Sequence, residues 1–307
     1  MTKPYRELSP YLRERLGGKT VKICIDGGFT CPNRDGMRGR GGCLFCGARG
    51  AGEFACGSAG VAEAITAGVT ERLRHPLGGR RADRFLAYFQ NFTGTYAPPA
   101  VLRERYDAAL CDERVVGLAI ATRADCVTEE IADLLAGYAE RMYVSVELGL
   151  QTASDTVAEE MHMACPRAAF PPAVSLLSAR GIDTVAHILA GLPGEEPADV
   201  LRTGAFVNRH PFSGIKVHSL YVTEGSELAS WWRAGRYRPW TEDAYVATVA
   251  ELLARARPDL VVHRLTGDPP RETLLAPDWC REKNRVRNEI VHCMMAHGWE
   301  QGCLYIP

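Results

Sequence analysis

The chain has 307 residues, of which 46% are hydrophobic, and a net charge of −1, so it can bury a large core and has neither the composition of a disordered chain nor the strong positive charge of many nucleic-acid-binding proteins. No apolar run approaches the roughly 18 residues that span a bilayer, and the first residues lack the pattern of a secretory signal, so we expect a cytoplasmic protein without membrane contact. Eleven cysteines, an odd number scattered along the chain, do not indicate a disulfide framework and fit a reducing compartment.

The N-terminal segment is basic. Residues 1–49 carry ten lysines and arginines against four acidic residues. Such a segment forms either a solvated charged face or a surface that follows phosphate groups, and the solvated face is the more common case.

A loop with three cysteines follows the first apolar run. Cys31, Cys43 and Cys46 supply three thiolate ligands and no evident fourth, and thiolate surroundings select zinc or an iron–sulfur cluster. A structural zinc site needs more ligands; Cys24 and Cys56 are the nearest, and Cys24 lies in an apolar run typical of a core thiol. A [4Fe–4S] cluster on three cysteines leaves one iron open to a substrate, and we favour this interpretation.

Short apolar runs alternate with helical patterns from about residue 20 to about 266. We expect strands at 21–26, 85–90, 115–121, 142–148, 184–190, 215–221 and 260–265, and helices near 59–74, 99–110, 128–140, 154–163, 168–179, 196–208 and 241–256. Strands that alternate with helices build a parallel sheet, which predicts an α/β fold. We divide the chain into a core domain, residues 1–266, and a C-terminal extension, residues 267–307, with an amphipathic segment at 281–297.

Polar side chains recur on one face of the expected strands. Glu147, His187, Lys216 and His218 share this face, whereas a filled barrel carries branched apolar side chains there. The pattern predicts a lumen that is open to a ligand.

Further polar residues fall at the carboxyl ends of the expected strands, where the cysteine loop also begins. They are Gln90, Arg123, Glu147, Gln151 and the turn that starts at Gly191. Each alone is more often a structural residue. Their convergence on one rim indicates a site, because barrels of this type collect their chemistry at the carboxyl ends of the strands.

Several motifs resemble the radical S-adenosylmethionine (SAM) superfamily. The spacing Cys31-x11-Cys43-x-Phe45-Cys46 resembles its cluster loop, and residues 146–151 and 187–195 are similar to later motifs. One bacterial family is resembled more closely by the amino-acid sequences of four segments, residues 26–36, 88–98, 263–268 and 277–283. That family is related to the catalytic subunit of Elongator and, more distantly, to the anaerobic coproporphyrinogen oxidases.

The resemblance implies a partial, incompletely closed TIM-type parallel β/α barrel. It implies that Cys31, Cys43 and Cys46 hold a [4Fe–4S] cluster that cleaves SAM reductively to a 5′-deoxyadenosyl radical, with one electron from a flavodoxin or ferredoxin-like reductant. The implied SAM contacts are Phe45 near the adenine, Glu147 and Gln151 near the ribose, His187 where relatives often have a ribose-contacting acid, Gln90 and Thr93 near the amino group, and the Gly191 turn.

One stretch departs from the family pattern. Relatives carry Asn-Arg-Gly-His, whose arginine meets the SAM carboxylate, where this chain has His162-Met163-Ala164-Cys165. A methionine cannot donate a charged hydrogen bond. Arg123, Lys216 and His162 are therefore the candidates to neutralise the carboxylate.

The resemblance to the Elongator subunit implies a substrate in tRNA, the 5-position side chain of wobble uridine. The basic N-terminal segment and the cluster Arg281, Lys283, Arg285 and Arg287 are compatible with phosphate contacts. Two other classes stay open: a radical SAM enzyme acting on a small metabolite or a tetrapyrrole, and a non-catalytic metal-binding protein.

A second cluster on the C-terminal cysteines is a further alternative. Cys280, Cys293 and Cys303 are irregularly spaced and have apolar neighbours, so we favour buried thiols at these positions.

Overall fold

A seven-stranded parallel sheet forms the centre of the computed structural model, which describes residues 3–47, 50, 60–79 and 81–307. The strand order is β1-β2-β3-β4-β5-β6-β8. The strands are β1 (Thr20–Ile25), β2 (Arg84–Phe89), β3 (Val115–Thr122), β4 (Tyr143–Gln151), β5 (Asp183–Ala190), β6 (Gly214–Ser219) and β8 (Val261–Arg264). All seven expected strands are confirmed, with small shifts at their ends.

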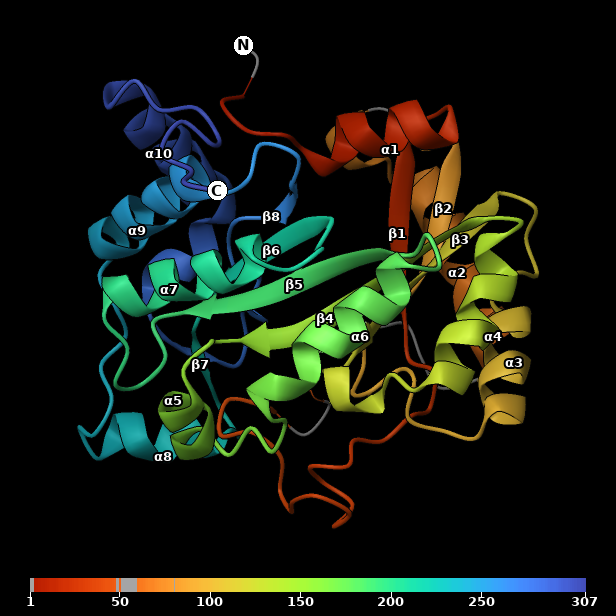
Figure 1. Cartoon of the computed structure of the whole chain (residues 1–307), viewed down its shortest axis with the longest axis horizontal. Helices are drawn as coiled ribbons and strands as arrows, with labels where there is room; N and C mark the ends of the chain where they lie inside the picture. The colour runs from red at the N-terminus through yellow and green to blue at the C-terminus, as the bar shows by residue number, and fades with distance from the viewer. Residues whose placement is uncertain (1–2, 48–49, 51–59, 80) are drawn as a thin grey trace.

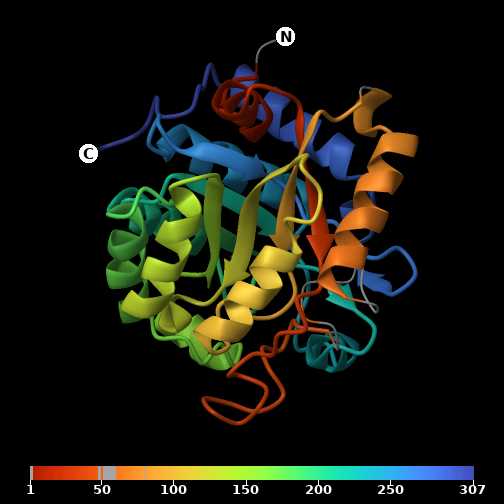
Figure 2. The same ribbon diagram turned by 90° about the vertical axis from the view of Figure 1, so that its right-hand side faces the viewer.

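Helices connect consecutive strands, and most of them cover the outer face of the curved sheet (Figures 1 and 2). They are α2 (Val61–Arg74), α3 (Pro99–Ala108), α4 (Glu129–Ala139), α5 (Asp155–Glu160), α6 (Phe170–Ser178), α7 (Pro197–Asn208), α8 (Glu227–Arg233) and α9 (Glu242–Arg255). Large side chains between sheet and helices, such as Phe85, Phe89 and Tyr106, are 0% exposed. Their burial supplies the main driving force for this layered arrangement.

Particular residues in the sequence fix several helix ends. The hydroxyl of Thr128 accepts from the N–H of Ile131 at the start of α4, and Thr241 caps α9 in the same way. Gly181 follows α6 with a φ of +69°. Because this left-handed conformation strains other residues, glycine is favoured there.

The sheet curves into a half-barrel and stays open, because β1 and β8 lie at its two edges and do not pair. Glu7, just before α1 (Leu8–Leu16), instead forms a parallel bridge with Val262 of β8. The N-terminal segment therefore lies against one edge of the sheet. This architecture agrees with the predicted partial TIM-type barrel.

The C-terminal region packs on the barrel rather than standing apart. The helix α10 (Lys283–Ala296) lies along α9, and the short strand β9 (Leu274–Ala276) pairs antiparallel with β7 (Val222–Thr223). The division at residue 266 stays a prediction. No helix in the described residues is long and apolar enough to cross a membrane.

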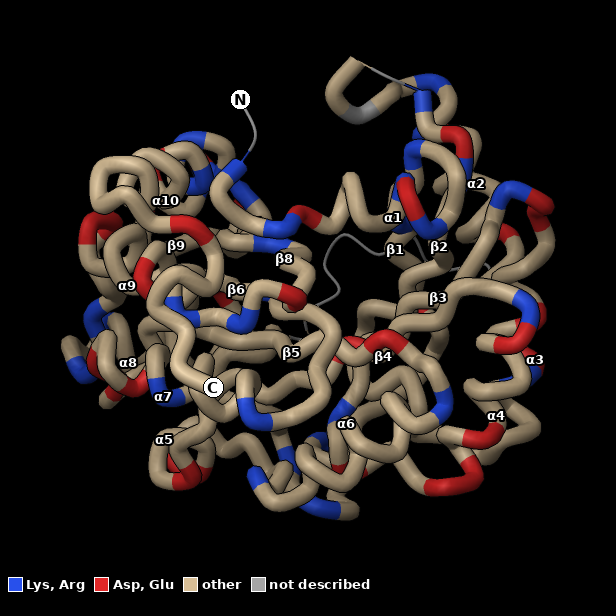
Figure 3. Tube along the Cα trace, turned by 45° about the horizontal axis from the view of Figure 1, so that its top comes forward, with Lys and Arg blue, Asp and Glu red and all other residues tan. Residues whose placement is uncertain are grey.

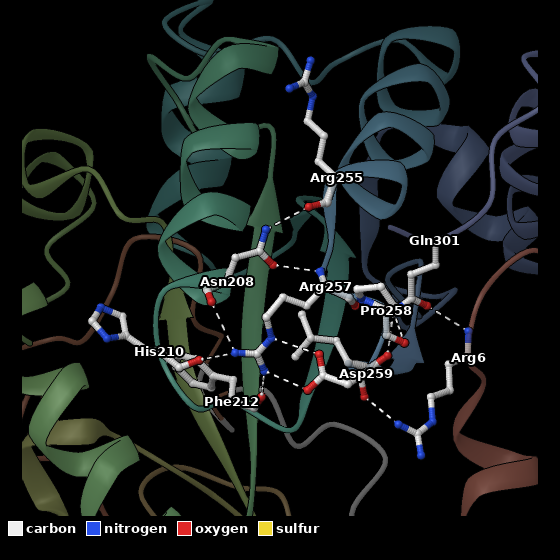
Figure 4. Close-up of polar contacts among 10 residues, drawn as sticks. Arg6, Asn208, His210, Phe212, Arg255, Arg257, Pro258, Asp259 and Gln301 are labelled. Atoms are coloured by element: carbon white, nitrogen blue, oxygen red, sulfur yellow. Dashed lines mark hydrogen bonds and ion pairs between the residues drawn. The ribbon is translucent and has the colours of Figure 1, made fainter. Parts of the chain in front are cut away.

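A hydrogen-bond network joins both chain ends to the amino-terminal ends of β6 and β8 (Figure 4). The Gln301 amide accepts from the N–H of Arg6 at 2.8 Å and donates to the Leu260 carbonyl, also at 2.8 Å. The Arg257 guanidinium donates to the carbonyls of His210 and Phe212, at 2.9 and 2.6 Å. These bonds satisfy carbonyls at the turns that lead into β6 and β8.

Candidate active site

The cysteine loop, residues 31–46, is held in place by Leu44. This side chain is 0% exposed and packs in a second apolar cluster with Met161 and Leu228. Its N–H donates to the carbonyl of Met161 at 3.1 Å, and its carbonyl accepts from the N–H of Leu228 at 2.9 Å. The loop therefore lies below the sheet, between the end of α5 and the start of α8 (Figure 1).

All three cysteines of the loop line one cavity of about 230 Å³ at the carboxyl ends of the strands. The same wall contains seven of the other predicted site residues: Phe45, Gln90, Thr93, Arg123, Glu147, Gln151 and His187. Residues of β2 to β6 and of the loop that follows β1 thus meet at one place, as the positions of their strands predict.

The donor set of this cavity fits a polynuclear cluster better than a single zinc ion. In the described part of the chain, no group of three or more His, Cys, Asp or Glu side chains is placed to hold one metal ion. Cys31, Cys43 and Cys46 are free thiols on one wall, and thiolates are the ligands of iron–sulfur clusters. Cys56, a candidate fourth zinc ligand, lies outside the described residues.

Arg34 shapes the end of the cysteine loop. Its guanidinium donates to the carbonyl of Gly47 at 2.5 Å. Gly42 has a φ of +94°, and a Cβ there would lie 2.9 Å from Arg34, so the backbone needs glycine at this point. The pKa of Cys46 is lowered by its hydrogen bond with Cys43 and also by the charge of Arg34. A lowered pKa favours the thiolate, the form of cysteine that binds metal.

Gln151 owes its position to an irregularity in β4. The register between β4 and β5 shifts between Gly149 and Gln151, and Gln151 has a φ of +62°. Few side chains tolerate this conformation, and such strain is more often found at functional sites. A Cβ on Gly149 would lie 3.0 Å from the Gln151 amide nitrogen. The bulge therefore turns the amide over Gly149 at the cavity wall.

Thr93 presents an unused polar atom to the cavity. The residue is 1% exposed and its N–H donates to the carbonyl of Thr30 at 3.2 Å. Among the described residues its Oγ1 has no hydrogen-bond partner. A buried hydroxyl without a partner is costly, so a bound polar ligand at this wall would satisfy it.

Gly191 lies away from the cavity. Its carbonyl accepts from the hydroxyl of Tyr237 at 2.8 Å, and a Cβ on it would lie 3.3 Å from Trp240. The residue has a φ of +91° and shapes the turn after β5. Its expected contact with SAM stays a prediction, and its observed contacts are structural.

Glu147 sits at the centre of a buried polar cluster inside the barrel. It is 0% exposed. Its Oε2 accepts from Tyr88 at 2.7 Å, from His187 at 2.6 Å and from Lys216 at 2.7 Å. Lys22 binds the other oxygen, Oε1. Because protein donors already surround the carboxylate, Glu147 is best suited to hold Lys216 and His187 in position.

The charges in this cluster are fixed by burial and by one another. Burial alone would raise the pKa of Glu147, but Lys216 and Lys22 hold it well below the ordinary value. Burial lowers the pKa of Lys216 to about 8. Burial and the charge of Lys216 lower the pKa of His187 to about 4, so His187 is neutral at neutral pH and its Nε2 donates to Glu147.

The three candidates for the SAM carboxylate are already engaged or lie elsewhere. Arg123 makes two hydrogen bonds to Asp125, at 2.9 and 2.8 Å. Lys216 pairs with Glu147. His162 lines a neighbouring hollow, which shares Met163 and Cys165 with the cavity, and does not line the cavity itself. A further arginine at the cavity, Arg167, went unnoticed in the sequence because it lies outside every motif.

The C-terminal basic cluster is largely neutralised by acidic neighbours. Lys283 pairs with Asp268 at 2.6 Å, and Arg285 pairs with Glu242 at 2.6 Å. Arg281 lies 3.5 Å from Asp278 and donates to two backbone carbonyls. Figure 3 shows acidic and basic residues interspersed along the chain.

The three C-terminal cysteines differ in how exposed they are. Cys280 is buried and lies 3.2 Å from the hydroxyl of Ser219, as expected for a core thiol. Cys293 is half-buried and Cys303 is exposed, so the expectation of burial is wrong for Cys303.

Comparisons with known proteins place this geometry in a family. Residues 212–296 match the profile described as the Radical_SAM C-terminal domain. The uncharacterized protein YtqA of Bacillus subtilis is 36% identical over 300 residues, which cover 98% of this chain and 92% of the relative. The tRNA uridine(34) acetyltransferase of Dehalococcoides mccartyi is 30% identical over 161 residues, which cover 51% of this chain and 34% of the relative.

The fold comparison agrees. The structure of Elp3 from the archaeon Methanocaldococcus infernus, with an N-terminal deletion, superposes with a TM-score of 0.68 at 14% identity. The match covers 92% of this chain and 64% of the archaeal chain, so this protein spans less than two thirds of that relative. The half-barrel, the profile and the near full-length relative agree: the chain belongs to the same family as YtqA, among the radical SAM enzymes related to Elongator.

Proposed function

We propose that Cys31, Cys43 and Cys46 hold a [4Fe–4S] cluster and that the cavity beside them holds SAM. The observation that carries the proposal is the meeting of three free thiols and unsatisfied polar groups at one cavity wall. When bound, this cofactor pair supplies reductive cleavage of SAM to a 5′-deoxyadenosyl radical, which takes a hydrogen atom from the substrate.

The residues of the chain orient and shield this chemistry. Thr93 offers its free hydroxyl at the wall, and Gln151 offers an amide turned inward by the bulge in β4. Phe45, between two of the cysteines, gives an aromatic face for the adenine. His187 and Lys216, fixed by Glu147, lie deeper in the barrel, where the substrate would meet the radical.

For the substrate we propose the 5-position side chain of wobble uridine in tRNA. Support comes from the partial match to a tRNA uridine(34) acetyltransferase and from the resemblance to the Elongator subunit. The ion pairs of the C-terminal basic cluster favour a different docking surface. Arg38 and Arg40 are exposed on the cysteine loop and line the hollow that shares Met163 and Cys165 with the cavity. Arg38 pairs with Asp125 at 3.0 Å.

A small anionic metabolite or a tetrapyrrole is the second candidate substrate, and the charges in the lumen favour it. Lys216 and Arg264 line the cavity, and the carboxylate of Glu147 is shared between Lys216 and Lys22. The lumen thus carries an excess of positive charge, which would attract the carboxylates of such a molecule.

Mass spectrometry of tRNA nucleosides tests the choice between these substrates. We expect a strain that lacks the gene to lose one modified wobble uridine. The wild-type gene should restore it and a Cys43→Ala gene should not. An unchanged nucleoside profile in the strain that lacks the gene, together with SAM cleavage by the purified wild-type enzyme, would reject tRNA and leave the small anionic substrate.

A further inference from the structure

Arg167 is a buried arginine whose guanidinium reaches the cavity wall. It lies in the turn before α6 and is 6% exposed. Its Nη1 donates to the carbonyls of Leu150 and Thr152, at 2.6 and 2.7 Å, and its Nη2 donates to the carbonyl of Cys165. These bonds join the end of β4 to the loop that precedes α6 and fix the guanidinium in one orientation.

This guanidinium has no counter-ion within the described residues. It forms no ion pair there, and its Nε is buried without a hydrogen-bond partner. Asp155 influences its charge from a distance, and the ring of Phe170 packs against its face at 5.1 Å. An arginine keeps its charge in proteins, so an unpaired buried guanidinium is costly unless a ligand supplies the anion.

Arg123, at the same cavity, shows the contrast. Its Nε and Nη2 make a bidentate contact with Asp125, which also pairs with Arg38, and Nη2 donates to the carbonyl of Ala164. Arg167 instead makes three hydrogen bonds to carbonyls, which carry no net charge, and keeps Nε free. Of these two arginines, Arg167 is the one whose charge still needs a partner.

The location of Arg167 narrows the identity of that partner. Arg167 lines the same cavity as Cys43, Gln151 and Met163. An anion bound here lies next to the cysteine loop. SAM carries one anionic group, its carboxylate, and a guanidinium binds a carboxylate with charge-assisted hydrogen bonds.

We infer that Arg167 binds the carboxylate of SAM in this chain, from a position four residues beyond Met163. The inference rests on the proposed function, since it takes SAM as the ligand of the cavity. Arg167 thereby compensates for the methionine at position 163, where the family resemblance implies an arginine. The backbone carbonyls of β4 hold the guanidinium ready before SAM arrives.

Binding of SAM and of decarboxylated SAM to the anaerobically prepared holoprotein tests this inference by calorimetry, without turnover. We expect wild type to prefer SAM. Arg167→Gln should reduce that preference by about tenfold to a hundredfold, because it removes a hydrogen bond between charged groups. Arg123→Gln is the matched control and should keep most of the preference, because Arg123 already holds a carboxylate, that of Asp125, in a bidentate contact.

Two more variants separate binding from folding. Arg167→Lys keeps the charge without the planar fork and should lie between wild type and Arg167→Gln. Met163→Arg in the Arg167→Gln background returns a guanidinium to the same loop and should restore the preference. If Arg167→Gln weakens both ligands equally, or if Met163→Arg restores nothing, the carboxylate assignment is wrong. If wild type binds neither ligand, the proposed function itself fails.

Discussion

Lys216 donates a hydrogen bond of 2.7 Å to the fully buried carboxylate of Glu147. The two residues lie on β6 and β4, with His187 of β5 between them. Lys22 of β1 approaches the same carboxylate from the other side of the curved sheet. With Tyr88 of β2 as a further donor, one carboxylate thus links five strands across the lumen and fixes the polar groups around it.

Glu147→Gln should destabilise the protein strongly. The substitution leaves the buried ammonium of Lys216 and the half-buried ammonium of Lys22 without their counter-ion. Breaking such a buried pair typically costs about 3–5 kcal/mol of unfolding free energy. Urea unfolding of the variant measures the loss. Adding Lys216→Met to this variant should recover part of it, because one of the unpaired charges is removed. A loss below about 1 kcal/mol, as for exposed pairs, would contradict the account.

The folded protein should lose stability as the pH falls from about 6.5 to about 4. His187 has a folded pKa of about 4 against an ordinary value of 6.5. The unfolded chain therefore binds a proton in this window that the folded protein does not, so His187 alone lowers stability by about 3 kcal/mol across it.

Urea unfolding at several pH values in this window, with His187→Gln as the comparison, checks the sign. The variant should show a shallower fall with decreasing pH. It should not become flat, because burial also lowers the pKa of His218 and the pKa of His263. An equal slope in wild type and variant would show that His187 is not held neutral in the fold.

Much of this site could be predicted, because alternate residues of a strand point to the same face of the sheet. Glu147, His187 and Lys216 occupy one face of neighbouring strands, and their meeting in the lumen was expected. The number of side chains that bond to the Glu147 carboxylate was not expected. Sequence alone does not show that Lys22, on a strand at the far edge of the sheet, curves round to the same carboxylate.

Other features were missed for physical reasons. The helix α1 has only Leu12 buried, so it lacks the apolar stripe that marks a helix in sequence. The helix α8 is seven residues long, too short for a clear period. Arg167 belongs to no recognisable sequence motif. It stands out because its guanidinium is buried without a counter-ion among the described residues, and this is visible only in the folded chain.

Leu44→Ala should release the cysteine loop and lower the iron content of the protein. Removing a fully buried leucine costs about 2–5 kcal/mol of stability, and here the cavity opens between Cys43 and Phe45. Iron per chain after anaerobic preparation measures the effect.

Leu12→Ala is the matched control for this variant. Leu12 is 3% exposed and belongs to a separate apolar cluster beneath α1. We expect a comparable loss of stability with iron content retained. Equal iron loss in the two variants would mean that iron follows global stability and not the anchoring of the loop.

Replacing Arg38 and Arg40 by alanine should weaken tRNA binding and reduce its salt dependence. Both side chains are exposed on the cysteine loop; Arg38 pairs with Asp125, which Arg123 also contacts, so one carboxylate faces two arginines there. For each arginine that binds a phosphate, its removal should make the slope of log K against log salt shallower by about 0.9. Filter binding across salt concentrations measures the slope.

The quadruple alanine variant of Arg281, Lys283, Arg285 and Arg287 serves as the comparison. Its charges are largely balanced by Asp268, Glu242 and Asp278, so we expect a smaller change in slope. A larger change in slope for the quadruple variant than for the Arg38 and Arg40 variant would make α10 the docking surface. An unchanged slope in both variants would show that neither surface binds tRNA.

The most direct test of the account is the formation of 5′-deoxyadenosine. Anaerobic protein incubated with SAM and dithionite should yield this product, as measured by chromatography. Cys31→Ala, Cys43→Ala and Cys46→Ala should each abolish both the product and the bound cluster. Cys165→Ala, which removes another thiol from the same cavity, should keep both. Loss of SAM to methyl transfer without any 5′-deoxyadenosine, or equal iron loss in Cys165→Ala, would contradict the three-cysteine radical SAM site.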